Sequence, residues 1–180
     1  VTLSNASNAG ISDSVGVATI TDVADIPPSM SISDVTVIEG NAATFIVTLS
    51  AASTNTISAD YATSDGSAGS SDYTPVTSSI TFSPNQTVQT ITVTTIQDNT
   101  YENNETFNVT LSSISNAAAG TTVAVGTIDD TADSPTISIG NVTVTEGGTA
   151  FFTVSLSNPV ASQTVTASYA TSNNSATAGS

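Results

Sequence analysis

Residues 30–50 read MSISDVTVIEGNAATFIVTLS and contain two runs, 30–38 and 44–50, in which apolar and polar side chains alternate. Alternation with a period of two is typical of β-strands that bury one face. In the second run, the phase expected to point inward comprises Phe45, Val47 and Leu49. This stretch therefore predicts two β-strands joined by a short loop, which is the start of an all-β fold.

The first of these runs contains a phase slip. Ile32 is out of phase with Val35 and Val37, and the same slip recurs at Ile139 and Val142. A β-bulge or a switch between two sheets produces such a slip. We expect one of the two at residues 33–34.

The same stretch belongs to an internal repeat. VTVIEG (35–40) returns as VTVTEG (142–147), and FIVTLS (45–50) returns as FTVSLS (152–157). VTLSNASNAG (1–10) returns as VTLSSISNAA (109–118), and YATS at 61 returns at 169. The spacing is 107 or 108 residues, about the size of an immunoglobulin-like sandwich. The sequence therefore predicts tandem sandwich units.

Proline-containing junctions divide the chain into three parts. Pro27, Pro28 and Pro135 mark the junctions. We expect residues 1–26 to be the C-terminal strands of one repeat and residues 136–180 to be the N-terminal strands of another. Residues 29–133, here called the middle unit, are expected to form one complete sandwich. The chain is thus interpreted as a window on a longer tandem protein.

The middle unit contains seven runs with strand patterns and no helical periodicity. They are 30–38, 44–50, 56–63, 78–82, 87–96, 105–112 and 121–128. Seven short strands in sequence are typical of an antiparallel immunoglobulin-like β-sandwich. The predicted fold class is therefore all-β.

The composition excludes several classes of function. The 180 residues carry a net charge of −15 and include no Lys, Arg, His or Cys. Nucleic-acid binding needs cationic side chains, and anionic membranes would repel such a chain. No His or Lys is present to activate a serine nucleophile, and acids on loop tips without an aromatic cleft do not resemble a glycosidase. No apolar run approaches the ~18 residues of a membrane-spanning helix. We therefore expect neither an enzyme nor membrane insertion within this window.

The acidic residues of the middle unit gather at one end of the predicted sandwich. Because antiparallel strands alternate in direction, alternate loops lie at the same end. This end, here called the acidic pole, is predicted to contain Glu39, Asp65, Asp72, Asp98, Glu102, Glu105, Asp129 and Asp130. The loops of the opposite end, 50–55, 83–86 and 112–120, contain no acid. Asp34, Asp60 and the linker residue Asp133 stand apart.

This asymmetry predicts a calcium site. Acids that merely keep the chain soluble would be expected at both ends of the sandwich. Two carboxylates ~4 Å apart repel by roughly 1–4 kcal/mol, and the chain has no cationic side chain to relieve this. Ca²⁺ accepts six to eight oxygen ligands from flexible loops, whereas zinc and copper prefer His or Cys.

The middle unit resembles the Calx-beta domain family. The resemblance is carried, in order, by VIEG (37–40), YATSDGSAGSSDY (61–73), ITFSPNQTVQTITVTTIQDN (80–99), YENNETFNVTLS (101–112) and GTIDD (126–130). It implies a calcium-binding sandwich with its ligands at one pole. The ligands implied are Glu39, Asp65, Asp98, Glu102, Glu105, Asp129 and Asp130. Asp72 is a weaker candidate, because a turn Asp commonly caps its own loop.

The sequence also departs from the family pattern. The family often has runs of Asp where this chain has QDN (97–99) and DDT (129–131), so fewer or weaker ions are expected. In the following repeat Asn173 replaces Asp65, although Glu146 is retained. In the preceding repeat Asp22 corresponds to Asp130 and Thr21 to Asp129. Asp22 and Glu146 are therefore only weaker candidate ligands.

These observations favour a calcium-binding structural repeat of a long extracellular protein, such as a bacterial cell-surface adhesin, a filament or a matrix component. Its expected partners are the neighbouring repeats and other copies in a filament. Three alternatives remain open. One is a glycan- or protein-binding adhesion module, although the acid-free loops contain no aromatic residue. The others are a calcium-sensor domain of a membrane protein and a self-assembling fiber in which partial units complete one another.

Overall fold

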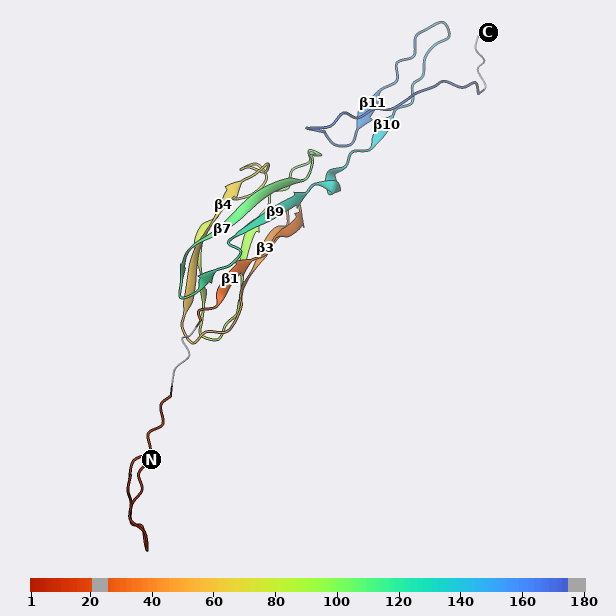
Figure 1. Cartoon of the computed structure of the whole chain (residues 1–180). Coiled ribbons are helices and arrows are strands. Elements are labelled where there is room, and N and C mark those ends of the chain that lie inside the picture. The colour runs from red at the N-terminus through yellow and green to blue at the C-terminus, as the bar shows by residue number, and fades with distance from the viewer. Residues whose placement is uncertain (21–25, 175–180) are drawn as a thin grey trace.

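The computed structural model describes residues 1–20 and 26–174 and is built almost entirely of β-strands (Figure 1). Within these residues the one helix is the single-turn 3-10 helix η1 (Thr131–Asp133). No helix in this part of the chain is both long and apolar enough to cross a membrane.

The strands follow the predicted runs with small changes at their ends. They are β1 (Ser29–Ile32), β2 (Val35–Ile38), β3 (Ala42–Leu49), β4 (Ile57–Asp65), β5 (Thr77–Phe82), β6 (Val88–Thr94), β7 (Glu105–Ser115), β8 (Ala118–Ala119), β9 (Val123–Asp129), β10 (Ile137–Ile139) and β11 (Val154–Leu156). The two-residue strand β8 was not predicted. The all-β fold class is confirmed.

Strands β1–β9 form two sheets that pack into a sandwich. One sheet has the order β6-β3-β1-β8 and the other β2-β9-β7-β4-β5. The predicted change at residues 33–34 is confirmed as a switch of sheet, because β1 and β2 lie in different sheets. Asp34 stabilises the switch by accepting a hydrogen bond from the Val125 N–H at 2.7 Å.

Two strand pairs depart from the predicted antiparallel pattern. β1 pairs in parallel with β8, and β2 pairs in parallel with β9. The second pair follows from the alternation of strand direction, since β2 belongs to the first of the seven predicted runs and β9 to the seventh. Both therefore run the same way through the sandwich. The chain enters the middle unit at one end and leaves it at the other (Figure 1).

Aromatic side chains fill the interior next to the acidic pole. Phe107 lies edge-on to Phe45, with ring centroids 5.8 Å apart, and stacks on Tyr73 at 4.5 Å. All three side chains are buried. A Cβ atom at Gly126 would lie 2.4 Å from the Phe107 ring, so the neighbouring strand needs glycine there. This packing holds the first residues of β7 beneath the pole.

Residues 136–174 reproduce the first hairpin of the middle unit. β10 and β11 pair with the register Ile137↔Leu156 and Ile139↔Val154, which matches Met30↔Leu49 and Ile32↔Val47 in β1 and β3. Here, however, the inward face is exposed. Side chains including Ile139, Phe152 and Val154 line a cavity of about 790 Å³.

Candidate metal centre

The turn between β2 and β3 places Glu39 at the acidic pole. Asn41 N–H donates to the Ile38 carbonyl at 3.1 Å, and Gly40 adopts a φ of 76°, which glycine tolerates best. The Glu39 N–H donates to the Asp129 carbonyl at 3.1 Å. The turn is therefore held against the end of β9, beside Asp129 and Asp130.

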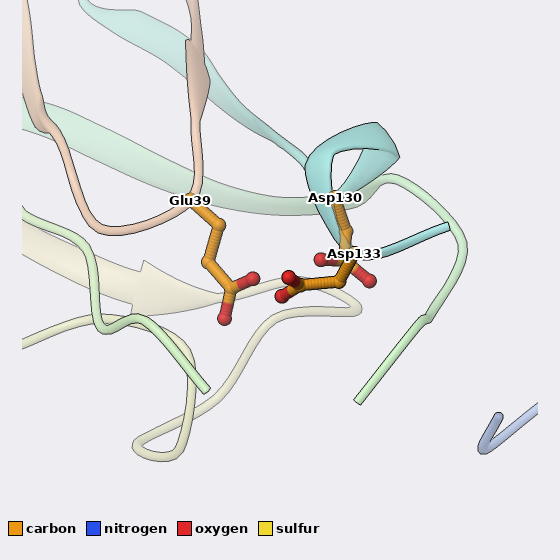
Figure 2. Close-up of side chains that lie close together, drawn as sticks. All are labelled: Glu39, Asp130 and Asp133. Carbon is orange, nitrogen blue, oxygen red and sulfur yellow. The ribbon is translucent and has the colours of Figure 1, made fainter. Parts of the chain in front are cut away.

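Three carboxylates converge beside this turn: Glu39, Asp130 and Asp133, here called the linker cluster (Figure 2). One oxygen from each lies within 4.8 Å of the others. Asp133 reaches this position because η1 turns the chain back immediately after β9. The prediction that Asp133 stands apart from the pole is wrong.

Asp130 is the buried member of the linker cluster. It is 5% exposed, and its Oδ1 atom has no hydrogen-bond partner among the described residues. Its Oδ2 atom accepts a short hydrogen bond from the Glu102 N–H. A buried carboxylate oxygen without a partner is costly, and such groups are normally paired or coordinate a metal. The geometry of Asp130 therefore fits a cation ligand.

The hydrogen-bond donors at the linker cluster are neutral. Gln97 Nε2 donates to Asp133 Oδ2 at 2.8 Å and to the Asp98 carbonyl at 2.7 Å. Glu39 Oε1 accepts from the Asp98 N–H at 2.8 Å. Since the chain has no Lys, Arg or His, no cationic side chain offsets the negative charge.

A second cluster, here called the loop cluster, comprises Asp72, Glu102 and Glu105. One oxygen from each again lies within 4.8 Å of the others. Asp72 Oδ2 also accepts from the Gly69 N–H at 2.6 Å, so Asp72 caps its own turn while facing the two glutamates. The Glu102 N–H bonded to Asp130 connects the two clusters through the 96–104 loop.

Burial raises the pKa of three glutamates, and the neighbouring carboxylates add to the rise. Burial raises the pKa of Glu39 to about 7, and the close Asp130 carboxylate adds to the rise. Burial likewise raises the pKa of Glu105 to about 7, with the Asp72 carboxylate as the next cause. The pKa of Glu102 is raised by burial and then by the negative charges of Asp98, Asp72 and Asp130. These three carboxyl groups therefore hold protons more tightly than an ordinary glutamate does.

Three predicted ligands lie outside both clusters. Asp65 Oδ1 accepts from the Tyr73 hydroxyl at 2.6 Å. Asp98 Oδ1 accepts from the Thr100 N–H at 2.6 Å, and Asp129 Oδ1 accepts from the Thr131 N–H at 3.0 Å. The structure thus brings together Glu39, Glu102, Glu105, Asp130 and the weaker candidate Asp72, and it adds Asp133.

Of the two candidate ligands in the flanking repeats, Asp22 and Glu146, the described residues include only Glu146. Glu146 is exposed and precedes Gly147, whose φ of 81° repeats the conformation of Gly40. Gly148 N–H closes that turn on the Thr145 carbonyl at 2.9 Å. Asp22 lies outside the described residues. Glu146 therefore occupies the same kind of turn as Glu39, but it belongs to neither cluster.

The protein is of the class that combines a two-sheet β-sandwich with clustered carboxylates at one pole. A family model, the Calx-beta domain, matches residues 25–132 and again residues 129–180. These matches include most of the chain, so the protein belongs to the Calx-beta family.

Solved structures share the fold at low sequence identity. The crystal structure of calcium binding domain CBD12 of CALX1.1 matches with a TM-score of 0.52 and 24% identity, over 56% of this chain and 45% of that chain. CBD12 from CALX1.2 gives 0.53 and 22%, over 57% and 45%. The Calx CBD2 domain gives 0.52 and 15%, over 57% and 86%. The match spans about half the length of the two CBD12 chains. Comparison with curated protein sequences finds no match.

The raised pKa values predict how stability depends on pH when no metal is bound. A carboxylate whose pKa rises on folding binds protons more tightly in the folded state, so its stabilising contribution is lost as pH rises. For Glu39 and Glu105 this loss falls between their ordinary pKa of 4.5 and about 7. The melting temperature of calcium-free protein is therefore expected to fall from pH 5 to pH 8. A scan that rises with pH over this range would contradict the assignment.

Proposed function

We propose that the protein is a calcium-binding structural repeat of a long extracellular protein. The observation that carries this proposal is the buried oxygen of Asp130 in the linker cluster, which has no hydrogen-bond partner among the described residues. Membership in the Calx-beta family and the likeness to structures titled calcium binding domains support it. Adhesins, filaments and matrix proteins are the long proteins in which such a repeat would act.

The ligand chemistry favours calcium over other metals. Each cluster offers only carboxylate oxygens, with backbone carbonyls nearby, and these are the ligands of hard cations. The acids of each cluster come from two separate segments of the chain, which suits the flexible coordination of Ca²⁺ better than the strict octahedron of Mg²⁺. In the linker cluster the ion would be held by Glu39, Asp130 and Asp133. In the loop cluster it would be held by Asp72, Glu102 and Glu105.

An ion in the linker cluster would also stiffen the joint with the next unit. Asp133 belongs to the linker, and its carbonyl accepts a hydrogen bond from Asn158 Nδ2 of the following unit at 3.0 Å. A cation bound to the Asp133 carboxylate would therefore fix the backbone from which the next unit extends. In this proposal calcium sets the angle between neighbouring repeats.

Two further features are part of the proposal. The partners are neighbouring repeats of the same chain and other copies in a filament, because the acidic surface has no cationic side chain for binding nucleic acid. The location is outside the cell, where calcium concentrations match the affinities of extracellular modules, about 10⁻⁴–10⁻³ M.

Calorimetry with matched variants tests the calcium site. Glu102→Gln removes one negative charge from the loop cluster, whereas Asp34→Asn removes one at the sheet switch. Affinity is tuned by the charge of the ligands, so Glu102→Gln is expected to weaken calcium binding at least tenfold. Asp34→Asn is expected to leave the affinity nearly unchanged, since an asparagine oxygen can still accept from Val125. Equal losses in the two variants would refute the site.

A further inference from the structure

The middle unit contacts the following unit through backbone and side-chain hydrogen bonds in equal number. Tyr101, in the 96–104 loop, forms a parallel bridge with Val160. The Tyr101 N–H donates to the Pro159 carbonyl at 2.9 Å, and the Ala161 N–H donates to the Tyr101 carbonyl at 3.2 Å. Gln163 Nε2 adds a hydrogen bond to Asn103 Oδ1 at 2.7 Å. The loop that carries Glu102 thus docks on the 158–163 loop.

The middle unit has the same receiving loop at its own opposite end. Ser157 N–H donates to the Thr136 carbonyl, and Ser50 N–H donates to the Ser29 carbonyl, both at 2.9 Å. The reciprocal bonds are also alike, since Thr136 N–H donates to Ser157 Oγ and Ser29 N–H to Ser50 Oγ, again both at 2.9 Å. These matching hydrogen bonds lie 107 residues apart in the sequence. At this spacing the 158–163 loop corresponds to residues 51–56.

Within the receiving loop of the middle unit, the two docking groups have no partner. Pro159 corresponds to Ala52, and Ala161 corresponds to Thr54. Neither the Ala52 carbonyl nor the Thr54 N–H is hydrogen-bonded to any residue in the described ranges 1–20 and 26–174. A pocket of about 380 Å³ adjoins these groups, lined by residues 26–28, 52–55 and Asn116.

We propose that residues 52–54 are a docking site for the loop equivalent to 96–104 in a preceding copy of the unit. The preceding loop would donate a backbone N–H to the Ala52 carbonyl and accept from the Thr54 N–H. Val160 of the following unit corresponds to Ser53 of the middle unit. Because the contact uses backbone groups, it does not depend on which of these side chains is present. The repeats would then join head to tail through one recurring contact, as in an open, non-closing assembly.

Charge supports this occupant. The loop that docks belongs to the acidic pole, whereas loops 50–55, 83–86 and 112–120 at the receiving end contain no acid. Head-to-tail contact therefore places a negative end against an uncharged end. The side-chain hydrogen bonds of the existing joint are not available at this site, because Asn158 corresponds to Ala51 and Gln163 to Thr56. The docking here consequently relies on the two backbone bonds.

A chain with one duplicated unit tests the proposal. The full chain is compared with an extended chain in which residues 27–133 occur twice in succession, so that the second copy of Thr54 follows a 96–104 loop. Amide hydrogen exchange is measured for both copies of Thr54 by NMR. The second copy is expected to exchange at least tenfold more slowly than the first. Ala161, which is already bonded to Tyr101, serves as the protected reference in both chains.

The docking proposal rests in part on the proposed calcium binding, which would stiffen the joint. The exchange of Thr54 is therefore measured both with calcium and with a chelator. Protection of the second Thr54 in both conditions, or in calcium alone, supports the docking site. Equal exchange of the two Thr54 copies in both conditions overturns it. Calorimetry on the same extended chain reports calcium binding independently, so a failure of docking is distinguishable from a failure of the metal site. Tyr101→Phe in the first copy keeps the backbone donor and is expected to retain the protection.

Discussion

Removal of calcium is expected to lower the melting temperature of the middle unit by about 10–20 °C. A ligand at a hundredfold excess over its Kd stabilises the native state by about 2.7 kcal/mol, and each kcal/mol shifts the melting temperature of a domain of this size by about 4–8 °C. The physical reason is the crowding of six carboxylates in the two clusters without a cationic side chain. Calorimetric melting of the full chain with calcium and with a chelator measures the shift.

The same samples report on the joint. The maximum dimension from small-angle scattering of a protein with several complete units is expected to shrink when calcium is removed, because the linker at 131–135 would lose the ion proposed to fix Asp133. The buffer should contain little salt, since screening relieves part of the repulsion by itself. If neither the melting temperature nor the maximum dimension responds to the chelator, the acids are a solvated surface.

Asp130→Asn is expected to change stability in opposite directions with and without calcium. With calcium, the variant loses a buried ligand, and the melting temperature is expected to fall by at least several degrees. Without calcium, the variant removes a buried, unpaired charge, whose burial costs several kcal/mol. The melting temperature of the calcium-free variant is then expected to lie above that of the calcium-free parent. Melting curves of both proteins in both conditions measure the reversal.

Asp60→Asn is the matched control for this reversal. It removes the same charge from an exposed position on β4, remote in its pairing from either cluster. Its melting temperature is expected to follow that of the parent within a degree or two in both conditions, as exposed charges contribute little. A fall in the stability of calcium-free Asp130→Asn, with Asp60→Asn unchanged, would mean that Asp130 serves the fold through its bond to Glu102.

Sequence periodicity predicted a β-bulge or a change of sheet at residues 33–34, and the alternation of strand direction predicted the acidic pole. Side chains along a strand alternate between its two faces with a strict period of two. A change of sheet between Ile32 and Val35 therefore appears in the sequence as a phase slip. The pole follows from alternate strand directions, and the structure brings five of the eight predicted acids into two clusters.

The remaining details depend on backbone turns that leave no periodic signal. Asp133 joins the linker cluster only because a single turn of 3-10 helix follows β9. Asp65 faces the Tyr73 hydroxyl because Tyr73 packs inward on Phe107, a contact between residues far apart in the sequence. A signal for Asp133 did exist, since its spacing of three from Asp130 matches one turn of such a helix.

The parallel pairing of β2 with β9 determines how the unit carries tension. The pairs run from Val35↔Gly126 to Ile38↔Asp129, so the strand near the point of entry lies directly against the strand at the point of exit. A pull on the two ends of the unit draws these strands past each other along their length. The hydrogen bonds between the two strands are then loaded in shear at the same time, and they do not break one after another. The β2–β9 pair thus resists a pull applied to the two ends of the unit.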